Sequence, residues 1–123
     1  MRFNWTTLWV KDMEKSLEFY QQVVGLPLKR RHAARPGMEL AFLGEGETQI
    51  ELICDTNRPS ISASTDISIG FEAESLDQLT RTLADRGIPV HSGPFSPNPS
   101  IRYLFVQDPD GWLVQFAEHA PAT

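Results

Sequence analysis

A carboxylate within an apolar strand is the strongest candidate for chemistry in this chain. Glu51 is flanked by Ile50 and Leu52 in a segment that has the composition of a β-strand. Carboxylates are rarely buried without a partner, and a carboxylate held in a cleft is a candidate general base. The alternative is a buried hydrogen bond with Gln115, which requires no ligand. The sequence leaves both interpretations open.

Indole, hydroxyl and amide side chains are expected to accompany this carboxylate. Strand alternation places two indoles and a hydroxyl on one face of the first strand, and small polar or amide positions on two later strands. On the penultimate strand, alternation lets either Arg102 or Tyr103 face the same way, but not both. The candidate ligand-binding residues are Trp5, Thr7, Trp9, Glu51, Ser68, Gly70, Arg102, Tyr103 and Gln115. This mixture suits a flat aromatic or cationic organic ligand, although the two tryptophans could instead simply fill a core.

The histidines and the cysteine do not form a recognisable reactive group. His32, His91 and His119 have no partner at the spacings that make a ligand pair on a strand or helix, so we expect exposed or edge histidines. The single cysteine, Cys54, permits no internal disulfide and fits a reducing cytoplasm.

The elements that position these residues occur twice, at an offset of about 63 residues. Each half reads as a strand, a helix and three more strands. The helices are predicted to begin after the N-cap residues Asp12 and Ser75 and to end at Gly25 and Gly87. The predicted strands cover residues 2–10, 28–33, 38–43 and 48–54, and then 66–71, 90–92, 101–107 and 112–118.

The two halves are predicted to share one domain over residues 1–123. A chain of this length buries roughly two-thirds of its unfolded surface, which is enough for one core. We expect unit one at 1–54 with a tight turn at 44–47, a polar linker at 55–64, and unit two at 65–119. The proline-rich segment 93–100 is predicted to be either a semi-rigid lid or a stiff connection.

Composition narrows the setting of this domain. The sequence has no apolar run long enough to span a bilayer and no signal-peptide core, so we expect a cytoplasmic protein without a membrane partner. The formal net charge is −5, and the one basic cluster, Lys29 to Arg31, fits a charged strand edge that resists unwanted pairing. We therefore expect no nucleic-acid partner.

Two motifs resemble the vicinal oxygen chelate superfamily, which includes glyoxalase I, extradiol dioxygenases and bleomycin-resistance proteins. The first runs from Val10 to Tyr20 (VKDMEKSLEFY) and leads into Val24-Gly25-Leu26. The second is the closing stretch from Asp108 to Glu118 (DPDGWLVQFAE). With the tandem repeat, the resemblance covers nearly the whole chain. It is specific for the fold and says little about any one activity.

The resemblance implies an α+β fold in which tandem β-α-β-β-β units form a cup-shaped mixed sheet around a ligand, and it implies a homodimer. Metal-dependent members of the family place ligands at positions that correspond here to Trp5, Glu51, Ser68 and Gln115. Glu51 alone keeps a metal-binding residue type, because tryptophan offers no lone pair and serine and glutamine are weak ligands. We therefore expect no metal and no other cofactor.

Two functions follow from this combination, and a third interpretation is a degenerate domain retained for protein interaction. The first is a metal-independent protein that sequesters an aromatic or cationic small molecule, as bleomycin-resistance members do. The second is a glyoxalase-like lyase or isomerase in which Glu51 acts as general base. The first requires open indole faces, whereas the second requires that a ligand can reach Glu51.

Overall fold

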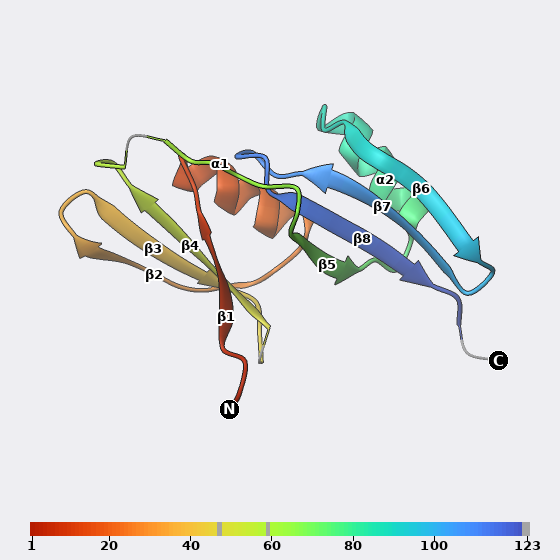
Figure 1. The fold of residues 1–123 in the computed structure, drawn as a ribbon, viewed down its shortest axis with the longest axis horizontal. Coiled ribbons are helices and arrows are strands. Elements are labelled where there is room, and N and C mark those ends of the chain that lie inside the picture. The colour runs from red at the N-terminus through yellow and green to blue at the C-terminus, as the bar shows by residue number, and fades with distance from the viewer. Residues whose placement is uncertain (47, 59, 122–123) are drawn as a thin grey trace. The chain divides into compact units, whose positions relative to one another are not determined.

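A computed structural model describes residues 1–46, 48–58 and 60–121 (Figure 1). Glu47, in the predicted 44–47 turn, and Pro59, in the predicted linker, lie outside the described residues. The chain divides into two compact units, Met1–Ser62 and Ala63–Thr123, and each contains one four-stranded sheet. The predicted α+β repeat of strand, helix and three strands is present in both units.

The first unit contains four strands and one helical segment. Its elements are β1 (Trp5–Trp9), α1 (Met13–Glu18), the π-helical turn η1 (Phe19–Val23), β2 (Leu28–Arg35), β3 (Met38–Leu43) and β4 (Gln49–Asp55). The strand order is β1-β4-β3-β2, with β1 parallel to β4 and the other pairs antiparallel. Strand β1 begins at Trp5, later than predicted, because Trp5 pairs with Gln49, the first residue of β4.

Local signals explain where the first helix begins and ends. The Asp12 side chain accepts a hydrogen bond from the Lys15 backbone N–H at 3.2 Å, as an N-cap residue should. The last turn widens into a π-helix, in which the Val24 N–H donates to the Phe19 carbonyl at 3.1 Å. Gly25 follows with a φ of +86°, a conformation that suits glycine and ends the helix.

The core of the first unit lies on one face of its sheet. Leu8, Leu43 and Leu52 are each no more than 4% exposed, and Leu17 of α1 and Tyr20 of η1 are buried as well. Because successive strand residues point to opposite faces, the strand register leaves the candidate site residues of β1 and β4 on the other face.

The second unit repeats the plan with one α-helix. Its elements are β5 (Ser68–Glu72), α2 (Leu76–Asp85), β6 (Val90–Asn98), β7 (Ile101–Gln107) and β8 (Leu113–His119), in the sheet order β5-β8-β7-β6. The Ser75 hydroxyl accepts from the Gln78 N–H at 3.1 Å at the start of α2, and Gly87, with a φ of +69°, follows its end. Leu76, Leu83 and Leu104 belong to the buried core of this unit.

The proline-rich segment 93–100 is mostly strand rather than a lid or a connecting loop. Strand β6 continues to Asn98, and Phe95 pairs with Tyr103 of β7. The prediction of a short strand at 90–92 was therefore wrong. Proline cannot donate to a sheet ladder, but β6 lies at the edge of its sheet, where prolines are tolerated at bulges and unpaired positions. Within the described ranges, no helix is long and apolar enough to cross a membrane.

Candidate ligand-binding faces

The strand register aligns four side chains in a row across the sheet of the first unit. Thr7 of β1 is the partner of Glu51 in β4, Glu51 is the partner of Phe42 in β3, and Phe42 is the partner of Arg30 in β2. Paired residues on neighbouring strands point to the same face. We call Thr7, Glu51, Phe42 and Arg30 the charged row. It faces away from the leucine core.

Glu51 is buried and engaged within the charged row. It is 8% exposed, and its Oε1 accepts a hydrogen bond from the Thr7 hydroxyl at 2.6 Å. The sequence placed Thr7 on this face but did not assign it to Glu51; Gln115 was the suggested partner, and that pairing stays a prediction. The hydrogen bond fixes one carboxylate oxygen, so a buried charge here has a partner inside its own unit.

The two tryptophans of β1 differ in the side chains that contact their rings. Trp5 is 42% exposed and meets Phe42 edge to face, with ring centroids 5.4 Å apart and planes at 81°. The ring of Trp9 carries the Arg58 guanidinium, with Cζ 4.3 Å from the ring centroid. Trp9 is therefore occupied by a cation of its own unit, whereas Trp5 presents more indole surface.

Three residues of this face were missed from the sequence. Phe42 belongs to the charged row, and Arg30 lies over its ring with Cζ 4.2 Å from the centroid. Arg58 follows β4 and is also anchored by donating from Nε to the Ser60 carbonyl at 3.3 Å. The internal repeat could have identified Phe42, because it corresponds to Phe105 in the second half. The offset between these two phenylalanines is 63 residues, the same as between Thr7 and Gly70.

The second unit has an equivalent row without charge. Gly70 pairs with Gln115, Gln115 with Phe105, and Phe105 with Ser92. We call these four residues the neutral row. A side chain at position 70 would bring its Cβ within 3.3 Å of Gln115 Oε1, so the glycine makes room for the amide. Ser68, exposed, lies at the start of β5 on the same face as Gly70.

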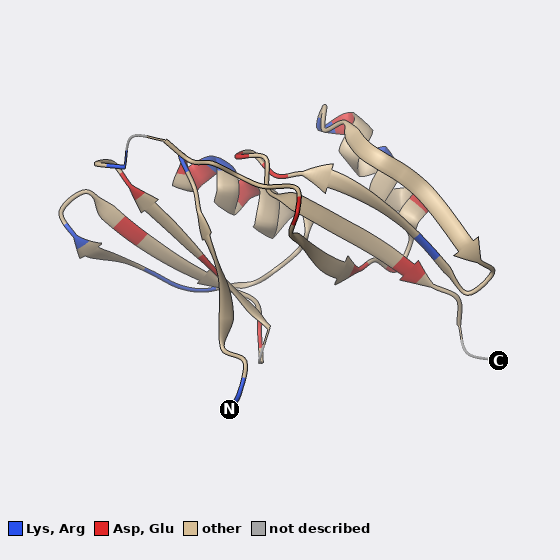
Figure 2. Ribbon diagram, in the orientation of Figure 1, with Lys and Arg blue, Asp and Glu red and all other residues tan. Residues whose placement is uncertain are grey.

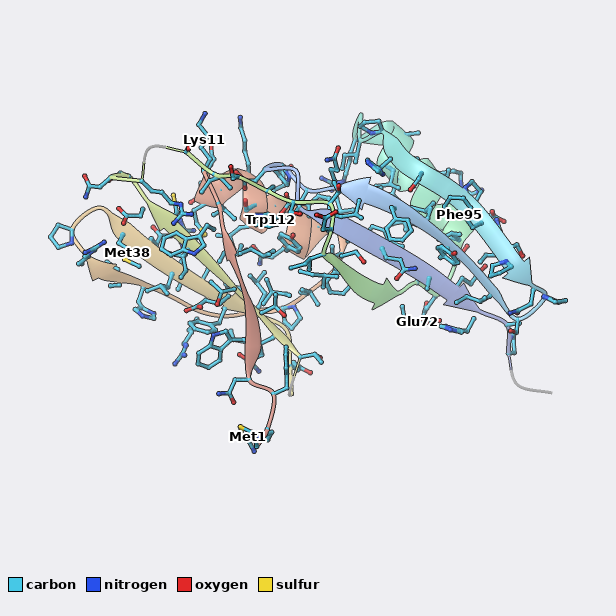
Figure 3. The ribbon with its side chains drawn as sticks, in the orientation of Figure 1. Met1, Lys11, Met38, Glu72, Phe95 and Trp112 are labelled. Atoms are coloured by element: carbon cyan, nitrogen blue, oxygen red, sulfur yellow. The ribbon has the colours of Figure 1, made fainter. Side chains whose placement is uncertain are left out.

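Tyr103, not Arg102, shares the face of Gln115. Tyr103 joins Phe95 and Phe105 in a series of ring contacts with centroid separations of 5.4 Å and 5.8 Å; Phe95 is labelled on β6 in Figure 3. Arg102 lies on the opposite face, where it pairs with Asp77 of α2 at 3.2 Å and with Glu118 of β8 at 3.5 Å. The sequence allowed either Arg102 or Tyr103 on this face, and the structure places Tyr103 on it and Arg102 on the opposite face.

Charged side chains elsewhere form short-range pairs. Figure 2 shows basic residues along β2 and on β7, and acidic residues on β3 and β8. On β2, Arg31 pairs with Glu14 and Glu39, and these hydrogen bonds raise the pKa of the Arg31 guanidinium. The exposed pair of Glu72 and His119 joins the ends of β5 and β8 at 2.6 Å. The hydrogen bonds from the His119 side chain and backbone lower the pKa of Glu72.

The residues at the family's metal positions do not fit a metal ion. The indole of Trp5 has no lone pair to offer a metal and is in T-shaped contact with Phe42, while Glu51 is hydrogen-bonded by Thr7. Ser68 and Gln115 supply a hydroxyl and an amide, which are weak ligands beside carboxylate or imidazole. Within residues 1–46, 48–58 and 60–121, no group of three or more His, Cys, Asp or Glu side chains is placed to hold a metal.

Comparisons with known proteins agree with the fold and with the motifs. The sequence model of the glyoxalase/bleomycin resistance protein/dioxygenase superfamily matches residues 2–116. A lactoylglutathione lyase of Neisseria meningitidis serogroup A is 33% identical, over 96% of this chain and 91% of that protein.

Solved structures show the same fold at lower identity. Glyoxalase I of Leishmania major, described as trypanothione-dependent, superposes with a TM-score of 0.82 at 23% identity, over 96% of this chain and 86% of that one. TnmS3, an antibiotic-binding protein from Streptomyces sp. CB03234, gives 0.74 at 21% identity, over 98% and 97%. The chain belongs to the glyoxalase/bleomycin resistance protein/dioxygenase superfamily, as its two motifs and its repeat predict.

Proposed function

We propose that this protein binds a planar aromatic small molecule without a metal ion, and that the exposed indole of Trp5 is the main stacking surface. The main support is the environment of Trp5: its indole is 42% exposed and is held in T-shaped contact with Phe42, at a position where the family resemblance implies a metal ligand. An indole fixed in this way offers an apolar face at little cost in side-chain entropy.

The face of the second unit supports the same kind of ligand. Its neutral row and the ring series of Phe95, Tyr103 and Phe105 combine aromatic surface with an amide. We propose Ser68, Gly70, Tyr103 and Gln115 as ligand-contacting residues. An antibiotic-binding protein has the same fold, which is consistent with a role of this protein in sequestering a small molecule.

Fluorescence of the three tryptophans tests this proposal. The variants Trp5→Phe and Trp9→Phe are titrated with a panel of flat aromatic compounds, and quenching and affinity are recorded for each. We expect quenching in the parent protein that is largely lost in Trp5→Phe and largely kept in Trp9→Phe, because Arg58 already covers Trp9. Equal loss in both variants, or no quenching by any compound, would refute the proposal.

A second candidate is a lyase or isomerase in which Glu51 is the general base. It is favoured by the 33% identity to proteins named lactoylglutathione lyase and by the burial of a carboxylate at this position. Formation or breakdown of lactoylglutathione by the purified protein, abolished in Glu51→Gln and retained in the control Glu74→Gln at an exposed carboxylate, would establish it. No turnover in the presence or absence of added divalent metals would leave binding as the function.

The wider setting of the protein is also proposed rather than shown. We propose a cytoplasmic homodimer in which residues 1–123 act as one domain. Exposed apolar side chains such as Phe3 and Ile67, which are 59% and 65% exposed, are surfaces that association could cover. Light scattering coupled to gel filtration measures the assembly, and a monomeric mass at all concentrations would reject the dimer.

A further inference from the structure

Two arginines of the first unit, Arg30 on β2 and Arg58 after β4, lie over aromatic rings, whereas Arg31 and Arg35 of β2 pair with carboxylates. Arg31 pairs with Glu14 and Glu39, and Arg35 pairs with Asp55 at 2.9 Å. Arg30 and Arg58 instead lie over Phe42 and Trp9. In the described part of the chain, no carboxylate lies within salt-bridge distance of Arg30 or Arg58, although the charge of Arg58 is among the causes that lower the pKa of Asp55.

Stacking changes what these guanidiniums can do. A guanidinium that lies flat on a ring is held in place by the ring, and its N–H groups point outward in the ring plane. These donors match the two oxygens of a carboxylate. Arg30 and Arg58 are therefore cations held close to aromatic rings; Arg58 donates its Nε–H to the Ser60 carbonyl, and the terminal N–H groups of both side chains remain to bind an anion.

The same contacts leave less room for a cationic ligand. A cation needs a free aromatic face, but Arg30 covers one face of Phe42 and Arg58 covers one face of Trp9. The local charge also disfavours a cationic ligand. This face of the sheet and its rim are net positive, although the whole chain has a net charge of −5. The charged residues there are three arginines and two carboxylates: Arg30, Arg35, Arg58, Glu51 and Asp55. Glu51 is also buried and hydrogen-bonded, which keeps its charge away from the open surface.

We infer that the ligand of this face is an aromatic acid, whose ring stacks on Trp5 and whose carboxylate is bound by Arg30, over the neighbouring Phe42, while Arg58, over Trp9, adds positive charge on the same face. The inference rests on the proposed function and specifies its ligand class. It replaces the broader expectation of an aromatic or cationic compound. Arg30 and Arg58 then determine specificity, and Trp5 supplies most of the stacking surface.

Three probes of one shape test the inference: 2-naphthoate, 2-naphthalenemethanol and 2-naphthylmethylammonium, which carry negative, zero and positive charge at neutral pH. Affinities are measured by calorimetry for the parent protein and for Arg30→Gln and Arg58→Gln. The matched control is Arg31→Gln, because it removes the same charge from the neighbouring residue on the opposite face of β2. Thermal melting of each variant shows whether it is folded.

The expected result is that 2-naphthoate binds at least about tenfold more tightly than the ammonium probe. Arg30→Gln and Arg58→Gln each weaken 2-naphthoate by about three- to tenfold and barely change the neutral probe, while Arg31→Gln changes neither. If the neutral or ammonium probe binds as well as 2-naphthoate, or if the two arginine variants bind 2-naphthoate like the control, the inference is overturned and aromatic binding stands. If no probe binds the parent protein, the proposed function fails, and the inference fails with it.

Discussion

At the scale of single residues, the hydrogen bond from Thr7 is the contact that anchors Glu51 in the charged row. The bond measures 2.6 Å, and Glu51 is 8% exposed. A buried carboxylate that loses one donor retains the cost of its desolvation. This makes Thr7 a stabilising residue whether the protein binds or catalyses.

The change Thr7→Val removes that donor while keeping the shape of the side chain. We expect the free energy of unfolding to fall by about 1–3 kcal/mol, because the Glu51 oxygen is left without a partner. Urea denaturation followed by circular dichroism measures the loss. Thr6→Val is the control on the same strand, and an equal change in both variants would show that the hydrogen bond contributes nothing.

The pair of Glu72 and His119 gives a prediction about pH. The hydrogen bonds from His119 lower the pKa of Glu72 in the folded protein relative to the unfolded chain. A lowered carboxyl pKa contributes stability that is present above the unfolded pKa and is lost as the pH falls through the folded pKa. The pair is exposed, so the contribution is small.

The change His119→Gln removes the imidazole and should move the Glu72 pKa back toward the ordinary glutamate range. A carbon-detected NMR titration of the side-chain carboxyl follows it directly. Figure 3 labels Glu72 at the end of β5, where its signal can be compared with that of exposed Glu74. An unchanged Glu72 titration in the variant would mean that the pair does not form in solution.

At the scale of elements, the sequence predicted the helices and the central strands better than the edges. The N-caps Asp12 and Ser75 and the glycines that follow each helix are local signals, and the structure confirms them. Strands β3 and β7 match their predicted bounds because each contains a short, continuous apolar run bounded by turn residues. The length of β6 was missed, because three prolines between 93 and 100 read as a loop and only pairing with β7 reveals a strand.

Part of the candidate site was also predictable from the sequence. Alternation placed Trp5, Thr7, Trp9 and Glu51 on one face, and the register confirms that grouping. The contacts of Arg30 and Arg58 with aromatic rings could not be predicted from the sequence. They depend on side-chain rotamers and, for Arg58, on the turn after β4, which no local pattern encodes. The choice between Arg102 and Tyr103 likewise needed the register of β7 against β8.

The cap of α2 allows a test at this scale. Replacing Ser75 with alanine leaves the Gln78 N–H without its acceptor, and we expect a loss of about 1 kcal/mol in the free energy of unfolding. Ser75→Asp should restore most of it, because aspartate is an equally good N-cap residue. Thermal melts of the three proteins measure the series, and a stable alanine variant would contradict the assignment of the cap.

At the scale of the whole molecule, the two repeats carry different side chains at corresponding positions. Thr7, Glu51 and Arg30 of the charged row correspond to Gly70, Gln115 and Ser92 of the neutral row, while the phenylalanine is kept in both. One unit therefore carries the ionic groups, and the other carries an amide and a row of rings. The family's fold serves several chemistries, and we propose that in this chain the arrangement serves to bind an organic acid rather than to chelate a metal.

The most direct test of the central claim is the affinity of 2-naphthoate for the purified protein, measured with and without divalent metals and accompanied by elemental analysis. We expect no stoichiometric metal, the same affinity after chelator treatment and after addition of Zn²⁺, Ni²⁺, Mn²⁺ or Fe²⁺, and a loss of affinity of about tenfold in Trp5→Ala. Binding or turnover that requires a metal ion, and that disappears together with that ion in Glu51→Gln, would contradict it.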